Sequence, residues 1–78
     1  MNEAETIKVN PRDYKSMIEL MDKYGDSKFP FHGKNENGER VIVSVSKDNI
    51  TVETFQDNDW IRKNTYWRDC TTEETYSR

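Results

Sequence analysis

Between residues 10 and 25 the apolar side chains recur at every third or fourth position. This period places them on one side of a helix, with charged residues on the other side. Asn10 is expected to cap the helix, Pro11 suits its first position, and Gly25 is expected to end it by adopting a positive φ. The residues of the predicted apolar stripe are Tyr14, Met17, Ile18, Met21 and Tyr24.

From residue 40 onward the pattern changes to an alternation with a period of two, which is typical of strands. Turn signals at Asn37-Gly38, Asp48-Asn49, residues 56–59 and Asp69-Cys70 divide this part into strands near 40–46, 50–55, 60–67 and 71–76. The Phe29-Pro30-Phe31 stretch adds an edge strand or a loop that fills the core. We therefore predict an α+β fold, with one N-terminal helix packed on an antiparallel four- to five-stranded β-meander.

Counting residues across the turns assigns each strand residue to a face of the predicted sheet. A two-residue turn at Asp48-Asn49 would place Val45 opposite Val52, and the even loop 56–59 would keep the next strand in step. The face toward the helix is then expected to hold Val41, Val43, Val45, Ile50, Val52, Ile61, Trp67 and Tyr76. The opposite face would hold Ile42, Ser44, Thr51, Glu53, Phe55, Trp60, Arg62, Asn64, Tyr66, Arg68 and Glu73.

Composition raises the question of whether the chain folds at all. It has 78 residues, of which 32% are hydrophobic and 35% charged, and its net charge is −3. Few apolar residues are typical of disorder, but nine aromatic residues and the clear periodicity favour a folded chain. We expect a flexible tail or short edge strand over residues 1–9 and a single α+β domain over residues 10–78.

The same composition narrows the expected location. No apolar run approaches the roughly 20 residues of a membrane-spanning helix, and no secretory signal is visible in the sequence. Cys70 is the only cysteine, so an internal disulfide is excluded. These features predict a cytoplasmic protein of a bacterial or phage-infected host cell.

Residue types that support catalysis or metal binding are scarce. His32 is the only histidine, so a catalytic triad would have to be built around it. A zinc site needs three or four nitrogen and sulfur ligands, which one histidine and Cys70 cannot supply. The glycines at 25, 33 and 38 do not form a phosphate-binding loop. We predict a non-enzymatic protein with no catalytic residue, no metal and no cofactor.

The segment from Trp60 to Arg68 carries the strongest functional signal, because it holds three basic residues and no acidic one. Aromatic residues and arginine are enriched at the centres of protein interfaces. The predicted binding surface comprises Ile42, Phe55, Trp60, Arg62, Asn64, Tyr66 and Arg68, and its expected partner is another protein or a second copy in a homodimer.

Two alternatives remain open for this surface. Bases of a nucleic acid or nucleotide could stack on its aromatic rings while arginine contacts phosphate, although the net charge of −3 favours a protein partner. In the other alternative the aromatic residues only shield the sheet, and Arg62 and Arg68 pair with Glu53 and Glu73 on neighbouring strands.

Three stretches of the second half carry a resemblance: residues 38–56 from GERV to ITVETFQ, residues 60–69 (WIRKNTYWRD) and the closing ETY at 74–76. They resemble the C-terminal meander of short uncharacterised proteins from Gram-positive bacteria and their phages or mobile elements. The likeness covers about half of the chain and is structural. A glycine would be expected after the aspartate of the last turn, where this chain has Cys70. The resemblance implies an accessory protein that binds and blocks a host component, similar to anti-CRISPR proteins.

Overall fold

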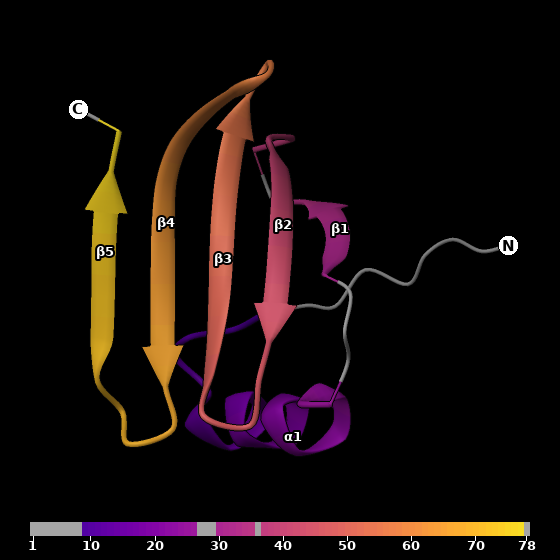
Figure 1. Cartoon of the computed structure of the whole chain (residues 1–78), viewed down its shortest axis with the longest axis vertical. Coiled ribbons are helices and arrows are strands. Elements are labelled where there is room, and N and C mark those ends of the chain that lie inside the picture. The colour runs from indigo at the N-terminus through magenta and orange to yellow at the C-terminus, as the bar shows by residue number, and fades with distance from the viewer. Residues whose placement is uncertain (1–8, 27–29, 36, 78) are drawn as a thin grey trace, which may run out of the picture.

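The computed structural model describes residues 9–26, 30–35 and 37–77. Within them the chain forms one helix and one antiparallel sheet whose five strands follow chain order (Figure 1). The elements are α1 (Tyr14–Tyr24), β1 (Phe31–Lys34), β2 (Arg40–Val45), β3 (Asn49–Gln56), β4 (Asp59–Trp67) and β5 (Thr72–Tyr76). The predicted α+β class, a helix with an antiparallel sheet, is confirmed. The predicted tail, apart from Val9, and Phe29 lie outside the described residues.

The start of α1 differs from the sequence prediction. Asp13 is the N-cap, and its side chain accepts a hydrogen bond from the backbone N–H of Ser16 (3.1 Å). Asn10 instead holds a turn that precedes the helix, because its side chain accepts from Arg12 N–H (3.1 Å). The prediction that Asn10 caps the helix is therefore wrong. Both residues are good caps, and proline suits a turn as well as a first helical position, so the sequence alone did not distinguish them.

No helix in the described part of the chain is long and apolar enough to cross a membrane.

Gly25 ends the helix for a different reason from the one predicted. Its φ is −63°, so the predicted positive φ is wrong. A Cβ built at Gly25 would lie 2.4 Å from the carbonyl oxygen of Met21 and 2.6 Å from Cγ of Lys47. Real side chains do not tolerate such distances. Glycine is required because the Met21 carbonyl at the end of α1 and Lys47 of the β2–β3 turn both lie where a Cβ would be.

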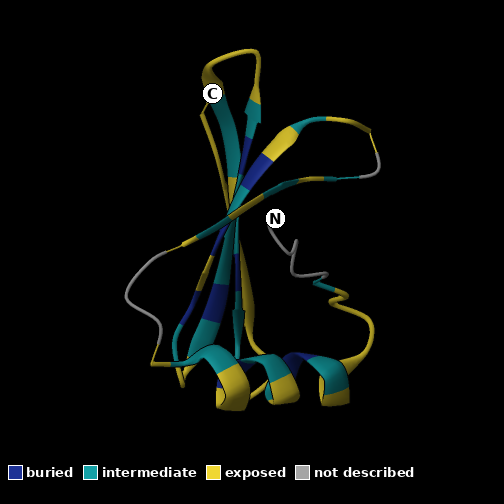
Figure 2. Cartoon of the chain, turned by 90° about the vertical axis from the view of Figure 1, so that its right-hand side faces the viewer, coloured by how far each residue is buried: buried dark blue, intermediate teal, exposed yellow. Residues whose placement is uncertain are grey.

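The core lies between α1 and the end of the sheet that the helix crosses. Figure 2 shows α1 across one end of a strongly twisted sheet, with the exposed residues of the helix turned away from the strands. The buried residues are Met17, Met21, Val41, Val43, Val45 and Ile50. Around them pack the partly buried side chains of Val9, Ile18, Leu20, Tyr24, Phe31, Val52 and Tyr66. The alternating valines and both buried methionines were predicted core residues, and they are confirmed.

The β2–β3 hairpin keeps the predicted faces but not the predicted pairing. Val45 lies opposite Ile50, whereas Val52 was predicted there. The reason is the turn: the N–H of Ser46 donates to the carbonyl oxygen of Asn49 (2.8 Å), so Lys47 and Asp48 form the tip. Moving a two-residue turn by one position shifts the pairing by two residues, and a shift of two leaves every side chain on the same face.

The β3–β4 hairpin contains an irregularity that changes the faces. Phe55 pairs with Trp60, but Thr54 pairs with Arg62. Ile61, which lies between them in β4, therefore has no partner on β3. One extra residue in one strand is a β-bulge. Beyond it, each side chain lies on the face opposite to the one that strict alternation would give. From Arg62 onward β4 therefore has the reverse of the predicted orientation. The prediction that Trp67 lies in the core face is wrong, because Trp67 pairs with Asn49.

Candidate functional site

The side of the sheet opposite α1 is called the open face below. In Figure 1 no described segment crosses it, and α1 makes its contacts with β2 and β3 from the other side. The pairing of β2, β3 and β4 places alternate residues of these strands on this face. Its central residues are Ile42, Thr51, Glu53, Phe55, Trp60, Lys63, Thr65 and Trp67.

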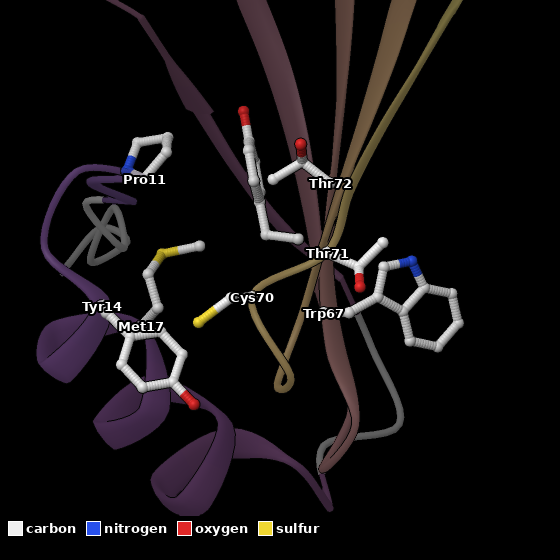
Figure 3. A pocket seen from close by; sticks show the side chains of 8 residues that line it. Pro11, Tyr14, Met17, Trp67, Cys70, Thr71 and Thr72 are labelled. Carbon is white, nitrogen blue, oxygen red and sulfur yellow. The ribbon is translucent and has the colours of Figure 1, made fainter.

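Both tryptophans lie on the open face, at opposite ends of β4. Trp60 is the partner of Phe55, and Trp67 is the partner of Asn49. Figure 3 shows the Trp67 indole pointing away from Tyr14 and Met17, which belong to α1. A strand rises about 3.3 Å per residue, so the two indoles are separated by about 20 Å along β4. Such a span exceeds what one small ligand contacts at once.

The side chains between the tryptophans are mixed in character. Glu53 and Lys63 face each other across β3 and β4, and Thr51 faces the buried Thr65. At the Trp60 end the guanidinium of Arg40 lies 4.6 Å from the centre of the Phe55 ring, a cation–π contact. Ile42, Phe55, Trp60 and Trp67 are each partly exposed. The open face thus combines exposed aromatic surface with charges of both signs.

Three of the seven residues predicted for the binding surface lie on the open face. These are Ile42, Phe55 and Trp60. Because of the bulge at Ile61, the other predicted strand residues lie on the helix side, and the structure does not bring them together with the first three. The displaced residues are Arg62, Asn64 and Tyr66.

Arg62 already has a partner on the helix side. Its Nη2 lies 3.6 Å from Oε1 of Glu39, which also accepts a hydrogen bond from the Asn35 side-chain amide (2.8 Å). Tyr66 packs against the core, and burial raises the pKa of its hydroxyl, with the charge of Glu74 adding to the effect. These side chains stabilise the fold and are not presented on the open face.

Arg68 lies in the turn after β4, outside the open face. Its Nη2 donates to Oδ1 of Asp22 (2.7 Å) and its Nε donates to the carbonyl oxygen of Lys47 (2.7 Å). Arg68 thereby connects three parts of the chain: the helix, the β2–β3 turn and the β4–β5 turn. The alternative pairing of Arg62 and Arg68 with Glu53 and Glu73 is wrong, because both arginines bind other carboxylates.

Sequence reasoning missed Lys63, Thr65 and Trp67 as open-face residues. Their positions follow from the single extra residue in β4. No turn-forming residue in the sequence marks this extra residue. The available signal is the pair Trp60-Ile61, two apolar residues in succession where strict alternation expects one. A bulge accommodates such a pair, because it leaves one residue of the strand outside the regular pairing.

A pocket of about 120 Å³ lies between the start of α1 and the β4–β5 turn (Figure 3). The Tyr14 hydroxyl donates to the carbonyl oxygen of Arg68 and closes one side of it. Desolvation and the neighbouring Cys70 thiol raise the pKa of Tyr14. Hydrogen bonds from Thr71 lower the pKa of Asp69. These contacts hold the turn against α1.

The only histidine and the only cysteine do not meet in the fold. His32 lies on β1 at one edge of the sheet, whereas Cys70 precedes β5 at the other edge. Both are exposed. Within the described ranges, no three His, Cys, Asp or Glu side chains gather into a group that could hold a metal ion.

Cys70 has a φ of 76°, a value that glycine adopts without strain. Replacing Cys70 with glycine is expected to raise the free energy of unfolding by about 0.5–1 kcal/mol, because the strain disappears. Cys70→Ala retains the Cβ and serves as the matched control, so it should bring no such gain. Urea denaturation of both variants measures the difference. Equal stability of the two variants would contradict the explanation by backbone strain.

Comparisons with family models, with curated proteins and with solved structures returned no match to this chain.

Proposed function

We propose that this chain is a small non-enzymatic binding module that acts by protein–protein interaction through its open face. The observation that carries the proposal is the grouping of Trp60, Trp67 and Phe55 on the one sheet surface that no described segment covers. Tryptophan and other large aromatic side chains dominate the energetics of protein interfaces when a partner buries them.

The dimensions of the open face support a macromolecular partner. Its two aromatic ends lie about 20 Å apart, which is comparable to the width of a standard interface of about 800 Å² per partner. The polar middle contains a cation and an anion, Lys63 and Glu53, so it suits a surface of mixed charge. A polyanion alone would be repelled by Glu53 and by the net charge of −3.

The biological role in this proposal is that of an accessory protein of a phage or mobile element. It would bind a host protein in the cytoplasm and block it by covering its surface, as an anti-CRISPR-like inhibitor does. The support is the resemblance of the second half of the chain to short proteins of that origin. A second copy of the chain, forming a homodimer, is the other occupant that the open face fits.

The test compares two double variants of the full chain. Phe55→Ala with Trp60→Ala removes aromatic surface from the open face, and Lys15→Ala with Glu19→Ala changes exposed residues of α1 as a matched control. We expect the first variant to lose at least 2 kcal/mol of association free energy, the usual loss at a hot spot. The readouts are the mass in solution and affinity capture from bacterial extract. Retention of every association by the open-face variant, with circular dichroism showing a native fold, would contradict the proposal.

One observation favours nucleic acid as a second candidate partner. The basic side chains of Arg40 and Lys63 share the open face with Phe55 and the tryptophans, so bases could stack while cations contact phosphates. This candidate predicts that single-stranded DNA or RNA quenches tryptophan fluorescence and that salt reverses the quenching. Unchanged fluorescence at low salt would reject nucleic acid and leave the protein partner.

A further inference from the structure

β5 forms one edge of the sheet, and all five of its residues are exposed. It pairs with β4 along one side. Along the other side no strand of the described part of the chain pairs with it. An edge strand presents backbone N–H and C=O groups that can hydrogen-bond to a further strand. The side of β5 that faces away from β4 is called the outer edge below.

The hydrogen bonds at the two ends of β5 show which residues point outward. Trp67 N–H donates to the carbonyl oxygen of Thr71 (2.8 Å), and Ser77 N–H donates to that of Ile61 (3.2 Å). In an antiparallel pair, successive residues turn their backbone groups alternately toward and away from the partner strand. Thr72, Glu74 and Tyr76 therefore direct their N–H and C=O groups to the outer edge.

Proteins usually prevent strand addition with proline, charged side chains, a bulge or a covering segment. β5 has no proline and no bulge, and no strand of the described residues pairs with its outer edge, so its two glutamates are the protecting feature that remains. The sequence of β5 is TEETY, and its pairing with β4 is regular. Its threonines and tyrosine also favour strand structure. At the other edge of the sheet, β1 has only four residues, contains Lys34 and directly follows Pro30.

The charges on β5 indicate what kind of strand would fit. Glu73 and Glu74 are consecutive, so they point to opposite faces of the sheet. The ion pairs formed by Arg62, Arg68 and Lys47 use other carboxylates, those of Glu39, Asp22 and Asp26. Glu74 accepts a hydrogen bond from the Tyr76 hydroxyl (2.9 Å) and remains exposed. Two adjacent cations on an added strand would each face one of these glutamates.

We propose that the outer edge of β5 binds an extended segment of another protein as a sixth strand, and that this segment carries two consecutive basic residues. Backbone hydrogen bonds to Thr72, Glu74 and Tyr76 supply affinity, and the two glutamates supply selectivity. A second copy is a poorer occupant, because its β5 would bring two further glutamates to an edge that already carries two. The inference is independent of the open face.

The probe for this edge is a short acetylated and amidated peptide that alternates threonine and valine around a central Lys-Arg pair. Titration into the isotopically labelled chain should shift the amide resonances of Thr72, Glu74 and Tyr76. A matched peptide with a central Glu-Glu pair should bind about tenfold more weakly, the effect of two exposed ion pairs of somewhat under 1 kcal/mol each. Methylating alternate backbone nitrogens of the Lys-Arg peptide should abolish binding.

Three variants of the chain make the experiment decisive. Glu73→Lys with Glu74→Lys should reverse the preference, so that the Glu-Glu peptide binds more tightly. Thr72→Pro removes an outward N–H and should weaken both complexes, while Phe55→Ala with Trp60→Ala should leave peptide binding unchanged. The proposal is overturned if β5 amides do not shift at millimolar peptide, or if both peptides bind wild type equally. A homodimer whose β5 amides are protected from exchange would also overturn it.

Discussion

Replacing Ile50 with alanine is expected to lower the free energy of unfolding by about 3–5 kcal/mol. Ile50 has no exposed surface and belongs to the same core cluster as Met17 and Met21. Removing its side-chain carbons loses their transfer free energy and leaves a cavity in a well-packed region. A chain of 78 residues has a total stability of about 4–12 kcal/mol. The variant is therefore expected to unfold at a much lower urea concentration.

Ile42→Ala is the matched control for Ile50→Ala. Both residues are isoleucines in neighbouring strands, but Ile42 lies on the open face and is partly exposed. Its truncation should cost about 1 kcal/mol or less, since surface changes have small effects. Urea denaturation followed by far-UV circular dichroism measures both. Equal costs for the two variants would mean that the two faces are not buried as described.

Deleting Asn64 is expected to destabilise the chain by at least about 3 kcal/mol, because it removes one residue from the regular part of β4 and reverses every side chain beyond it. In a ladder that keeps Lys63 opposite Glu53, Tyr66 would leave the core, and the indole of Trp67 would turn toward α1. Thr65 would take the place of Asn64 opposite Val52, on the helix side. Each alternative register restores some contacts only by breaking backbone pairing with β3 or β5.

Deleting Ile61 is the matched control, because it also shortens β4 by one residue. It removes only the extra residue of the bulge, so Trp60 stays opposite Phe55 and Arg62 stays opposite Thr54, and the deletion should cost about 1 kcal/mol. Thermal unfolding monitored by near-UV circular dichroism reports both stability and the tryptophan environment. If the two deletions gave the same stability and the same spectrum, Ile61 would not be the extra residue of β4.

The helix and the hairpins could be predicted because their determinants are local. A stripe at positions 17 and 21 and an alternation at 41, 43 and 45 are set by neighbouring residues and by burial. The predicted faces of β2 and β3 were correct although the predicted turn was one position away, since the resulting shift of two residues in the pairing preserves the faces. Gly25 was assigned to the right place for the wrong reason, because its close contact with Lys47 depends on the tertiary fold.

The candidate surface was harder to predict, because its membership depends on one residue in β4. Counting residues correctly joined Phe55 to Trp60, since the loop 56–59 keeps the two strands in step up to that pair. Beyond Ile61 the same count assigns each side chain to the wrong face. Arg62 and Arg68 were predicted as exposed cations of the binding surface. In the structure Arg62 instead forms an ion pair with Glu39, and Arg68 forms one with Asp22. Such pairs join residues far apart in sequence, and no local pattern reveals them.

The helix covers only one end of the sheet, and this explains how so few apolar residues suffice. Among the described residues, two buried side chains of α1 and four of the sheet form the core cluster. Farther along the helix side, the polar contacts of Asn35, Glu39 and Arg62 connect β4 to the β1–β2 turn. Phe55 and both tryptophans are thereby available to the open face.

The grouping of both tryptophans with Phe55 on the uncovered face is most directly tested by the register of β3 and β4. In an antiparallel sheet the α-protons of a non-hydrogen-bonded pair approach closely. The described register predicts strong nuclear Overhauser effects between the α-protons of Glu53 and Lys63 and between those of Thr51 and Thr65. A pattern that instead joins Glu53 to Arg62 and Thr51 to Asn64 would place Trp67 on the helix side and contradict the account.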